Sequence, residues 1–319
     1  EYIYKFVSKA MWSNSDIGGG LKAGDKYLND GTLYVAVFNE DGSGEWKALV
    51  HGQNGLDAFN SVLPFNGQDE VLVFARAAAD AAGATKMDRP EWVSVSPMTG
   101  DVYVTLTNNK YRGVRDDQPV SASNPRSYQS SGKALGNDNG HIIRWAEAGG
   151  DHAATSFEWD IYLFGAPSDL SAENLSQLND NNDFSSPDGL YFDPRGVLWI
   201  QTDDGAYTDI SSCMLLAALP GKVSDGSMTT TSAGQSTRVG TSASNDNIKR
   251  FFVGPEGCEV TGITMAPDFK TLFINIQHPG NTWGAVAGGS IPRSATVMIT
   301  REDGDVILAE SFDTADSTT

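Results

Sequence analysis

One phrase recurs three times along the chain and limits what it can fold into. In each copy, an apolar strand leads through a proline-containing turn into a second apolar or aromatic strand, in segments 91–109, 188–205 and 259–277. The turns combine proline with glycine, aspartate or lysine, which is typical of tight hairpins. The repeat therefore predicts antiparallel hairpins as the basic unit of an all-β fold.

Each hairpin is followed by two more segments of strand composition, so that the repeating unit has four strands. These segments are 141–148 and 157–165, then 213–219 and 247–254, and finally 294–302 and 305–311. Repeated four-stranded antiparallel units with long inserted loops are typical of β-propeller blades. A β-sandwich is the alternative, but the repetition of whole four-strand units favours the propeller.

The number of blades predicts an incomplete ring. Segment 29–50 adds two strands of a similar unit, which gives three full blades and about one and a half more, starting in mid-blade at Glu1. We interpret residues 1–319 as a single propeller domain, the C-terminal part of a larger propeller whose N-terminal half is not in this chain. An open ring exposes unpaired edge strands, so we expect N-terminal sequence or another chain to cover them. A complete five-bladed ring is the alternative.

Composition excludes some classes of protein. The net charge is −19, which argues against binding to nucleic-acid phosphate. No segment approaches the run of about 18 apolar residues that a membrane-spanning helix needs. Cys213 and Cys258 are too few for a disulfide framework, and a bridge between them stays open. Helical spacing of apolar residues in 68–85 predicts one helix that ends near Gly83.

Three strands expected to line the propeller channel are each entered by a carboxylate. Glu91 precedes WVSVS, Asp188 precedes GLYFD and Glu259 precedes VTGIT. At equivalent places in successive blades these groups would face one another and raise one another's pKa values. A hard cation removes this repulsion, and calcium accepts about six to eight oxygen ligands. We therefore predict a metal site; for each carboxylate alone, capping a turn or pairing with a nearby base is the alternative.

An arginine lies two residues before the first of these carboxylates. Arg89 belongs to KMDRPEW (86–92), and Pro90 biases it toward extended backbone, which puts its side chain on the same side as Glu91. A guanidinium beside a metal cluster can bind a phosphate or carboxylate group. A salt bridge to Glu91 or Asp88 is the alternative.

Two further features carry weaker signals. His278 in NIQHPG (275–280) ends a hairpin strand, where it can bind a ligand or serve as a general acid. A hydrogen-bonded turn residue is the alternative. The acidic segments 179–183 and 201–205 do not have the spacing of a calcium-binding loop, and we interpret them as solvated turns; binding of additional calcium is the alternative.

Several motifs together resemble the PhoX-type alkaline phosphatases. They are ATKMDRPEW (84–92), GHIIRW (140–145), SPDGLYFDPRGVLWIQTD (186–203), GPEGCEVTG (254–262) and TLFINIQHPG (271–280). The motifs occur in the family's order and span nearly the whole chain. The resemblance implies a large propeller phosphomonoesterase that depends on calcium (Ca2+) and iron (Fe3+). It also implies a periplasmic or secreted protein, exported by the twin-arginine route.

The resemblance assigns roles to particular residues. Arg89 would be the catalytic arginine that binds the substrate phosphate, while Glu91 and Asp188 would bind metal. We assign Glu259 to metal binding and His278 to substrate binding mainly from their positions in the blades.

The chain also departs from the family pattern. Family members are considerably longer, and their N-terminal half supplies further metal ligands, including a cysteine thiolate to iron. Neither Cys213 nor Cys258 lies in that motif. The expected partners are a phosphate monoester and the N-terminal half of the same protein or another chain. The alternative function is a non-catalytic, calcium-stabilised extracellular propeller that serves as a binding, assembly or filament subunit.

Overall fold

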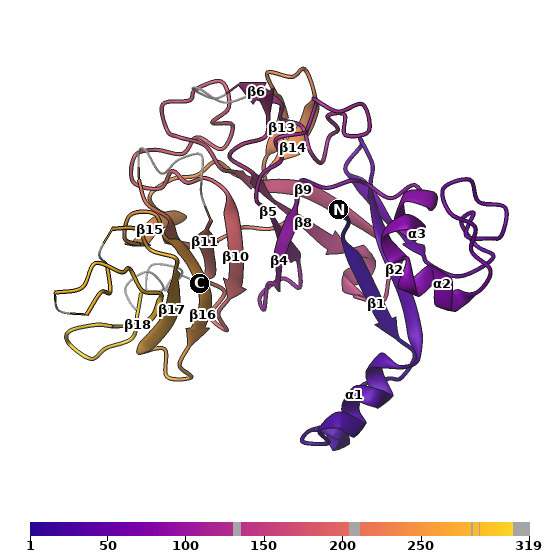
Figure 1. Cartoon of the computed structure of the whole chain (residues 1–319), viewed down its shortest axis with the longest axis horizontal. Coiled ribbons are helices and arrows are strands. Elements are labelled where there is room, and N and C mark those ends of the chain that lie inside the picture. Colours follow the sequence, from indigo (N-terminus) through magenta and orange to yellow (C-terminus); the bar gives the residue numbers. More distant parts are fainter. Residues whose placement is uncertain (130–134, 204–210, 282, 287, 309–319) are drawn as a thin grey trace, which may run out of the picture.

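A computed structural model describes residues 1–129, 135–203, 211–281, 283–286 and 288–308. Over these residues the fold is all-β, with antiparallel sheets and a few short helices. Figure 1 shows the sheets arranged as an arch, with β1, β4, β10 and β16 along its concave side. This arrangement is consistent with a propeller-like fold. No helix among the described residues is long and apolar enough to cross a membrane.

The largest sheet curls from β1 round to β4 in the order β1-β2-β3-β9-β8-β5-β4, and the short strands β13 and β14 join it at β9. Its strands are β1 (Tyr4–Ser8), β2 (Gly31–Phe38), β3 (Ser43–Ala48), β4 (Pro90–Val95), β5 (Val102–Leu106), β8 (His141–Glu147), β9 (Ser156–Phe164), β13 (Ser227–Thr230) and β14 (Ser236–Val239). The run β4-β5-β8-β9 is the first predicted unit of four antiparallel strands. It continues into the β1–β3 unit because β3 pairs with β9.

The second predicted unit also forms a four-stranded sheet, made of β10 (Pro187–Phe192), β11 (Leu198–Thr202), β12 (Met214–Ala218) and β15 (Ile248–Val253). The third sheet contains three strands, β16 (Glu259–Met265), β17 (Thr271–Gln277) and β18 (Ala295–Thr300). The strand predicted for 305–311 is wrong over its described part, because Asp305–Leu308 form no strand and residues 309–311 lie outside the described residues. Strands β6 (Tyr128–Gln129) and β7 (Leu135–Gly136) form a separate small hairpin.

The helix predicted for 68–85 is divided in two. Helix α2 (Gln68–Val73) and helix α3 (Ala75–Ala81) meet at Phe74, whose φ of −102° and ψ of 39° are not helical. Gly83 follows the second helix with a φ of +72°, as expected of a glycine that ends a helix. Because of the break, both helices pack apolar side chains against β2. Val35 of β2, Val71 of α2 and Ala78 and Ala79 of α3 are all fully buried.

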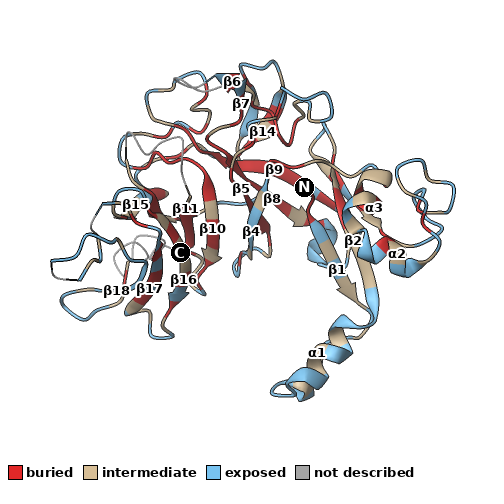
Figure 2. Ribbon diagram, in the orientation of Figure 1, coloured by how far each residue is buried: buried red, intermediate tan, exposed pale blue. Residues whose placement is uncertain are grey.

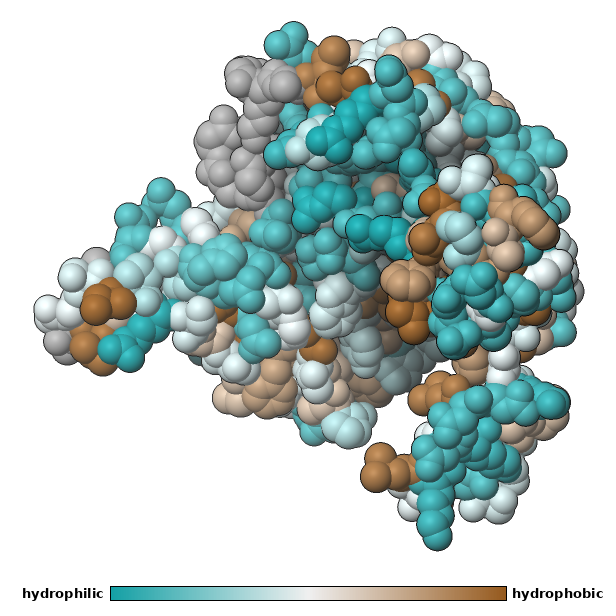
Figure 3. Space-filling view, turned by 45° about the vertical axis from the view of Figure 1, so that its right-hand side comes forward, coloured by the Kyte–Doolittle hydropathy of each residue, from teal (hydrophilic) through white to brown (hydrophobic). Residues whose placement is uncertain are grey.

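Most of the hydrophobic core is formed by side chains of the strands that make up the arch. Figure 2 shows buried residues concentrated on the central strands and exposed residues on the loops and on α1. All five residues of β5 are buried, and Phe38, Trp46, Trp145, Phe157 and Trp159 pack edge-on or tilted beneath the largest sheet. Helix α1 (Leu21–Leu28) instead extends away from the body, and Figure 3 shows hydrophobic side chains on its surface.

Candidate metal and phosphate site

Strands β4 and β10 begin with the same local structure, which consists of a left-handed residue, a proline and a carboxylate. Residues 89–91 form it at β4 and residues 186–188 form it at β10. The backbone φ is +53° at Arg89 and +47° at Ser186, in a region that residues other than glycine seldom occupy. Such a conformation persists only where the surrounding structure holds it, and it is often found at functional sites.

The carboxylate in each case lies in a β-bulge. In β4 the register passes from Pro90↔Leu106 to Val93↔Val104, so Glu91 and Trp92 together lie opposite Thr105. In β10 an equal shift puts Asp188 and Gly189 opposite a single residue, Gln201. Bulges bend a strand and re-aim its side chains, and they are common beside active sites. Glu91 and Asp188 therefore occupy equivalent positions, as the sequence predicts.

The third carboxylate does not occupy that position. In β16 the register shift lies between Thr261 and Thr264, so the residue equivalent to Glu91 is Gly262, and Glu259 lies three residues earlier. The expectation that all three carboxylates have equivalent positions is wrong for Glu259. Its carboxylate accepts a hydrogen bond from the side-chain amide of Gln277, its cross-strand neighbour.

These side chains nevertheless influence one another electrostatically. Burial raises the pKa of Asp188 to about 7, and repulsion from Glu91, Glu259 and Asp203 acts in the same direction. Burial also raises the pKa of Glu91 against the opposing charge of Arg89. We call Glu91, Asp188, Asp203 and Glu259 the acidic cluster. A cation bound among these carboxylates would stabilise their charged forms.

Asp203 is the member of the cluster that the sequence analysis missed. One ligand atom each from Asp203, Glu259 and His278 lies within 4.8 Å of the others. Asp203 follows β11, and its backbone N–H donates to the carbonyl of Ser186 at 3.1 Å. The segment QTDDG was interpreted as a solvated turn, since nothing in it shows that the turn ends beside another sheet. In the sequence, the position of Asp203 directly after the second strand of a hairpin is the feature that could have indicated its role.

The donor atoms suit a hard cation. The acidic cluster draws its carboxylate oxygens from four strands or strand ends, and these are the ligands that calcium prefers. The Nε2 atom of His278 lies 3.5 Å from a Glu259 oxygen, and its Nδ1 atom lies 3.3 Å from the carbonyl of Gly257. The His278 side chain is 59% exposed, which leaves it accessible to a ligand.

Arg89 lies beside the cluster and is held loosely. Its Nη1 atom donates to Oδ1 of Asn108 at 2.8 Å, and its Nη2 atom lies 3.8 Å from Oε1 of Glu91. The side chain is 48% exposed, so part of the guanidinium remains free to bind an anion. The expectation that Pro90 holds Arg89 in extended backbone is wrong, because its φ is positive. The side chain still reaches Glu91, as the sequence analysis expected.

The backbone before Arg89 is anchored by a buried network. Asp88 has no exposed surface, and its carboxylate accepts hydrogen bonds from Arg112 and Asn109 at 2.8 Å and from Asn137 at 3.0 Å. Asn137 also donates to Nδ1 of His141, whose Nε2 atom donates to the carbonyl of Ser123 at 2.9 Å. We call Asp88, Asn109, Arg112, Asn137 and His141 the Asp88 network. It ties the loop after β5 to the residues that precede Arg89.

The two cysteines do not join the site. Cys213 and Cys258 are both buried and unbridged, and both belong to the core between the second and third sheets. Burial raises the pKa of Cys258 to about 11, so its thiol is protonated at neutral pH although it directly precedes Glu259. The open question of a bridge is thus answered: no disulfide joins Cys213 to Cys258.

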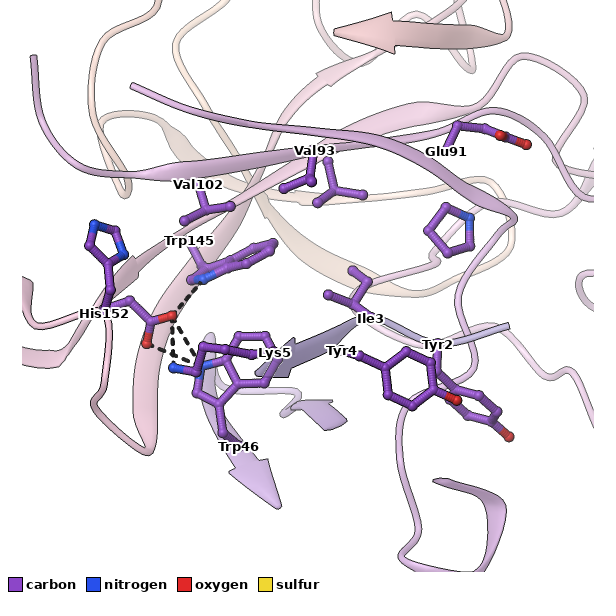
Figure 4. A pocket seen from close by; sticks show the side chains of 13 residues that line it. Tyr2, Ile3, Tyr4, Lys5, Trp46, Glu91, Val93, Val102, Trp145 and His152 are labelled. Carbon is purple, nitrogen blue, oxygen red and sulfur yellow. Dashed lines mark hydrogen bonds and ion pairs between the residues drawn. The ribbon is translucent and has the colours of Figure 1, made fainter. Parts of the chain in front are cut away.

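A pocket of about 330 Å³ lies between β1 and β4. Figure 4 shows it lined by aromatic and aliphatic side chains, with Glu91 at the opposite end from Lys5. The Glu147 carboxylate accepts hydrogen bonds from the indole N–H groups of Trp46 and Trp145 and lies 3.1 Å from the Lys5 ammonium. The pocket is therefore apolar, with a balanced ion pair at one end, and it meets the acidic cluster only at Glu91.

The fold is all-β, and carboxylates gather at its inner strands beside an accessible arginine and histidine. Proteins with such a site form a class that can bind cations together with an anionic ligand. Comparison with known proteins places the chain within a particular family. The chain belongs to the alkaline phosphatase PhoX family, whose model matches residues 1–280.

A solved structure agrees with this assignment. The chain is 39% identical to Pseudomonas fluorescens PhoX in complex with vanadate, a transition state analogue, with a TM-score of 0.79. The match covers 96% of this chain and 50% of that one, so the chain spans about half the length of the solved protein. No curated protein matches the sequence.

Proposed function

We propose that this chain carries part of the active site of a metal-dependent phosphomonoesterase, of the alkaline phosphatase type, that hydrolyses phosphate monoesters. The observation that carries the proposal is the accessible guanidinium of Arg89 next to a cluster of carboxylates with raised pKa values. The family assignment and the vanadate complex of the similar structure support the same chemistry.

In this proposal Arg89 is the catalytic residue and binds the phosphoryl group. A guanidinium can donate two parallel hydrogen bonds to a phosphate, which fixes orientation as well as neutralising charge. Asn108 and Glu91 orient the guanidinium from behind, and its exposed part faces the substrate. His278, which is also exposed, binds a further substrate oxygen.

Glu91, Asp188 and Glu259 hold calcium in this proposal, and Asp203 joins them. Bound cations offset the negative charge that develops on the phosphoryl oxygens in the transition state. Neither cysteine can add a thiolate ligand from its buried position, so iron enters the proposal only through ligands from outside this chain. Sheet residues position the carboxylates, and the cation relieves their repulsion.

We also propose that further polypeptide completes this site. The similar solved protein is about twice as long as the matched region, and β1 and β4 have a pocket between them rather than a shared strand. An added strand would pair with an open edge and fill the pocket with apolar side chains. The added strand comes from the remaining half of a single propeller domain, supplied by the same protein or by another chain. Export to the periplasm or the medium belongs to the same proposal.

The test is hydrolysis of an aryl phosphate by the native material, with calcium and iron supplied and the mass of every component measured. Arg89→Ala should lower kcat/KM by about a thousandfold, since charge neutralisation at the phosphoryl group is lost. It should change the free energy of unfolding by less than about 0.5 kcal/mol, because the side chain is half exposed. The matched control is Arg115→Ala, which removes an exposed arginine that stacks on Tyr111. Unchanged hydrolysis by folded Arg89→Ala would refute the role of Arg89.

A specific observation also favours a second function, that of a non-catalytic assembly subunit. The arm that carries α1 exposes five large apolar side chains, Met11, Trp12, Ile17, Leu21 and Leu28. Apolar side chains gathered on a projecting element are typical of interaction surfaces. If the native material binds calcium but hydrolyses no phosphate ester with any metal, this second function replaces the first.

A further inference from the structure

One buried hydroxyl connects the two bulges that carry Glu91 and Asp188. Thr105 lies in β5, directly opposite the bulge in β4, and has no exposed surface. Its Oγ1 atom accepts a hydrogen bond from the backbone N–H of Trp92 at 3.0 Å. The same atom donates to the backbone carbonyl of Asp188, in the neighbouring sheet, at 2.6 Å. One side chain thus contacts the bulge of each sheet.

Both hydrogen bonds reach backbone groups that lie in the bulges. A bulge disrupts the ladder of its own hairpin, so one backbone group near the extra residue loses its cross-strand partner. A hydroxyl offers one donor and two acceptor lone pairs, and Thr105 uses the donor for one sheet and a lone pair for the other. Because threonine is β-branched, its χ1 angle has few alternatives once it is buried in a strand. The connection between the bulges is therefore short and stiff.

We propose that Thr105 is a positioning residue that couples the two bulges and thereby sets the separation of the Glu91 and Asp188 carboxylates for a shared cation. This inference rests on the proposed cation site and adds a residue outside the ligand set. Groups that orient metal ligands through hydrogen bonds typically contribute about 10- to 100-fold to metal affinity. Thr105 acts on the backbone of Asp188 and of Trp92, the residue after Glu91, rather than on the carboxylates themselves.

A second hydrogen bond between the same two sheets provides an internal control. The Oγ atom of Ser94 accepts from the backbone N–H of Phe192 at 2.9 Å, so it joins β4 to β10. Phe192 lies at the far end of β10 from Asp188. Loss of this hydrogen bond weakens the contact between the sheets but leaves both bulges in place. Ser94 thus separates an effect on sheet packing from an effect on the position of the carboxylates.

The experiment compares Thr105→Val, Thr105→Ser and Ser94→Ala in the native protein with every component present. Valine keeps the shape of threonine and removes both hydrogen bonds, whereas serine keeps the hydroxyl. Calcium binding is measured by titration calorimetry, and folding is checked by thermal unfolding. We expect the calcium Kd to rise about tenfold or more in Thr105→Val. In Thr105→Ser and Ser94→Ala it should stay within about twofold of the wild type. A Thr105→Val variant that binds calcium as tightly as the wild type overturns the proposal.

A measurement without metal keeps this inference separate from the proposed function. Hydrogen exchange of the Trp92 amide and the carbonyl 13C shift of Asp188 report the two hydrogen bonds directly. Both should change in Thr105→Val and remain as in the wild type in Ser94→Ala. If the native protein, with every component present, takes up no calcium, the cation site is refuted, and these two signals still decide whether Thr105 links the bulges. Unchanged signals in Thr105→Val refute the link itself.

Discussion

Asp88 and Glu91 lie three residues apart in the chain, yet the charge of Asp88 is balanced by the fold, whereas that of Glu91 and of its equivalent Asp188 is not. Asp88 is fully buried, yet three side chains of the Asp88 network donate to it. Glu91 and Asp188 are less buried, but burial and the charges of other carboxylates, Glu259 and Asp203 among them, raise their pKa values against the opposing charge of Arg89. A carboxylate whose partners are all supplied by the fold serves the structure. One whose charge remains uncompensated is available to a ligand.

The sharpest test of this comparison is to remove the balanced carboxylate. Asp88→Ala leaves the buried Arg112 without its partner, and we expect the free energy of unfolding to fall by about 3–5 kcal/mol. Chemical denaturation measures the loss. The control is Asp117→Ala, whose carboxylate is 62% exposed and 3.5 Å from Lys86; its effect should stay within about 0.5 kcal/mol. Equal effects of the two substitutions would contradict the distinction.

Acid should weaken the Asp88 network through His141. Burial lowers the pKa of His141 from 6.5 to about 4, although the charge of Asp88 opposes the shift. Between about pH 4 and pH 6.5, His141 carries a proton in the unfolded chain and none in the folded chain. Stability therefore falls as pH decreases through this window, by about 3 kcal/mol in total. Urea denaturation at pH 7 and pH 4.5 should show a smaller difference for His141→Gln than for the wild type. An equal difference would refute the contribution of His141.

The acidic cluster should behave in the opposite way. The pKa of Asp188 is raised to about 7, so without metal its ionisation destabilises the fold as pH rises from about 4 toward 7. Asp188→Asn removes that charge. We expect the metal-free variant to be more stable than the wild type at pH 8, on the order of 1 kcal/mol after allowance for solvent screening.

Calcium binding tests the role of Asp188 in a second way. Calcium should raise the Tm of the wild type, and it should raise the Tm of Asp188→Asn much less. Thermal unfolding with calcium and with a chelator measures both quantities. A variant that is less stable than the wild type without metal would show that Asp188 is a structural carboxylate like Asp88.

The smallest expected effect concerns the orientation of Arg89. Asn108→Ala removes the 2.8 Å hydrogen bond to the guanidinium, and we expect phosphate to bind the calcium-loaded chain about fivefold more weakly, which corresponds to about 1 kcal/mol. Titration with inorganic phosphate measures the change. Asn66→Ala, which alters an exposed asparagine that hydrogen-bonds Glu70, is the control. Unaltered phosphate binding by Asn108→Ala would mean that Arg89 needs no orienting partner.

Local patterns predicted much of the fold. Alternating apolar residues with proline and glycine turns located the hairpins β4–β5, β10–β11 and β16–β17, because these pairings are short-range and follow from turn chemistry. The strand expected at 305–311 was wrong over Asp305–Leu308, where the backbone N–H of Ile307 instead donates to the carbonyl of Phe269, in the turn between β16 and β17. The single helix expected over 68–85 was also wrong, because packing against β2 divides it at Phe74.

The candidate site shows the same division between local and tertiary information. Their places directly before the apolar strands WVSVS and GLYFD marked Glu91 and Asp188 in the sequence. Asp203 could not be recognised, because its neighbours along the chain are those of an ordinary turn and its partners come from another sheet. The position of Glu259 was misjudged by three residues, since a bulge is a property of two paired strands and leaves no pattern in one.

The sequence by itself determined the all-β class, the hairpins and the identity of the residues that enter the inner strands. These depend on side-chain alternation and turn residues, which act over a few positions. The tertiary structure alone decided which carboxylates are balanced and which are not. Charge balance depends on donors such as Arg112 and Asn137, which lie 24 and 49 residues from Asp88 along the chain and reach it only when the sheets have folded.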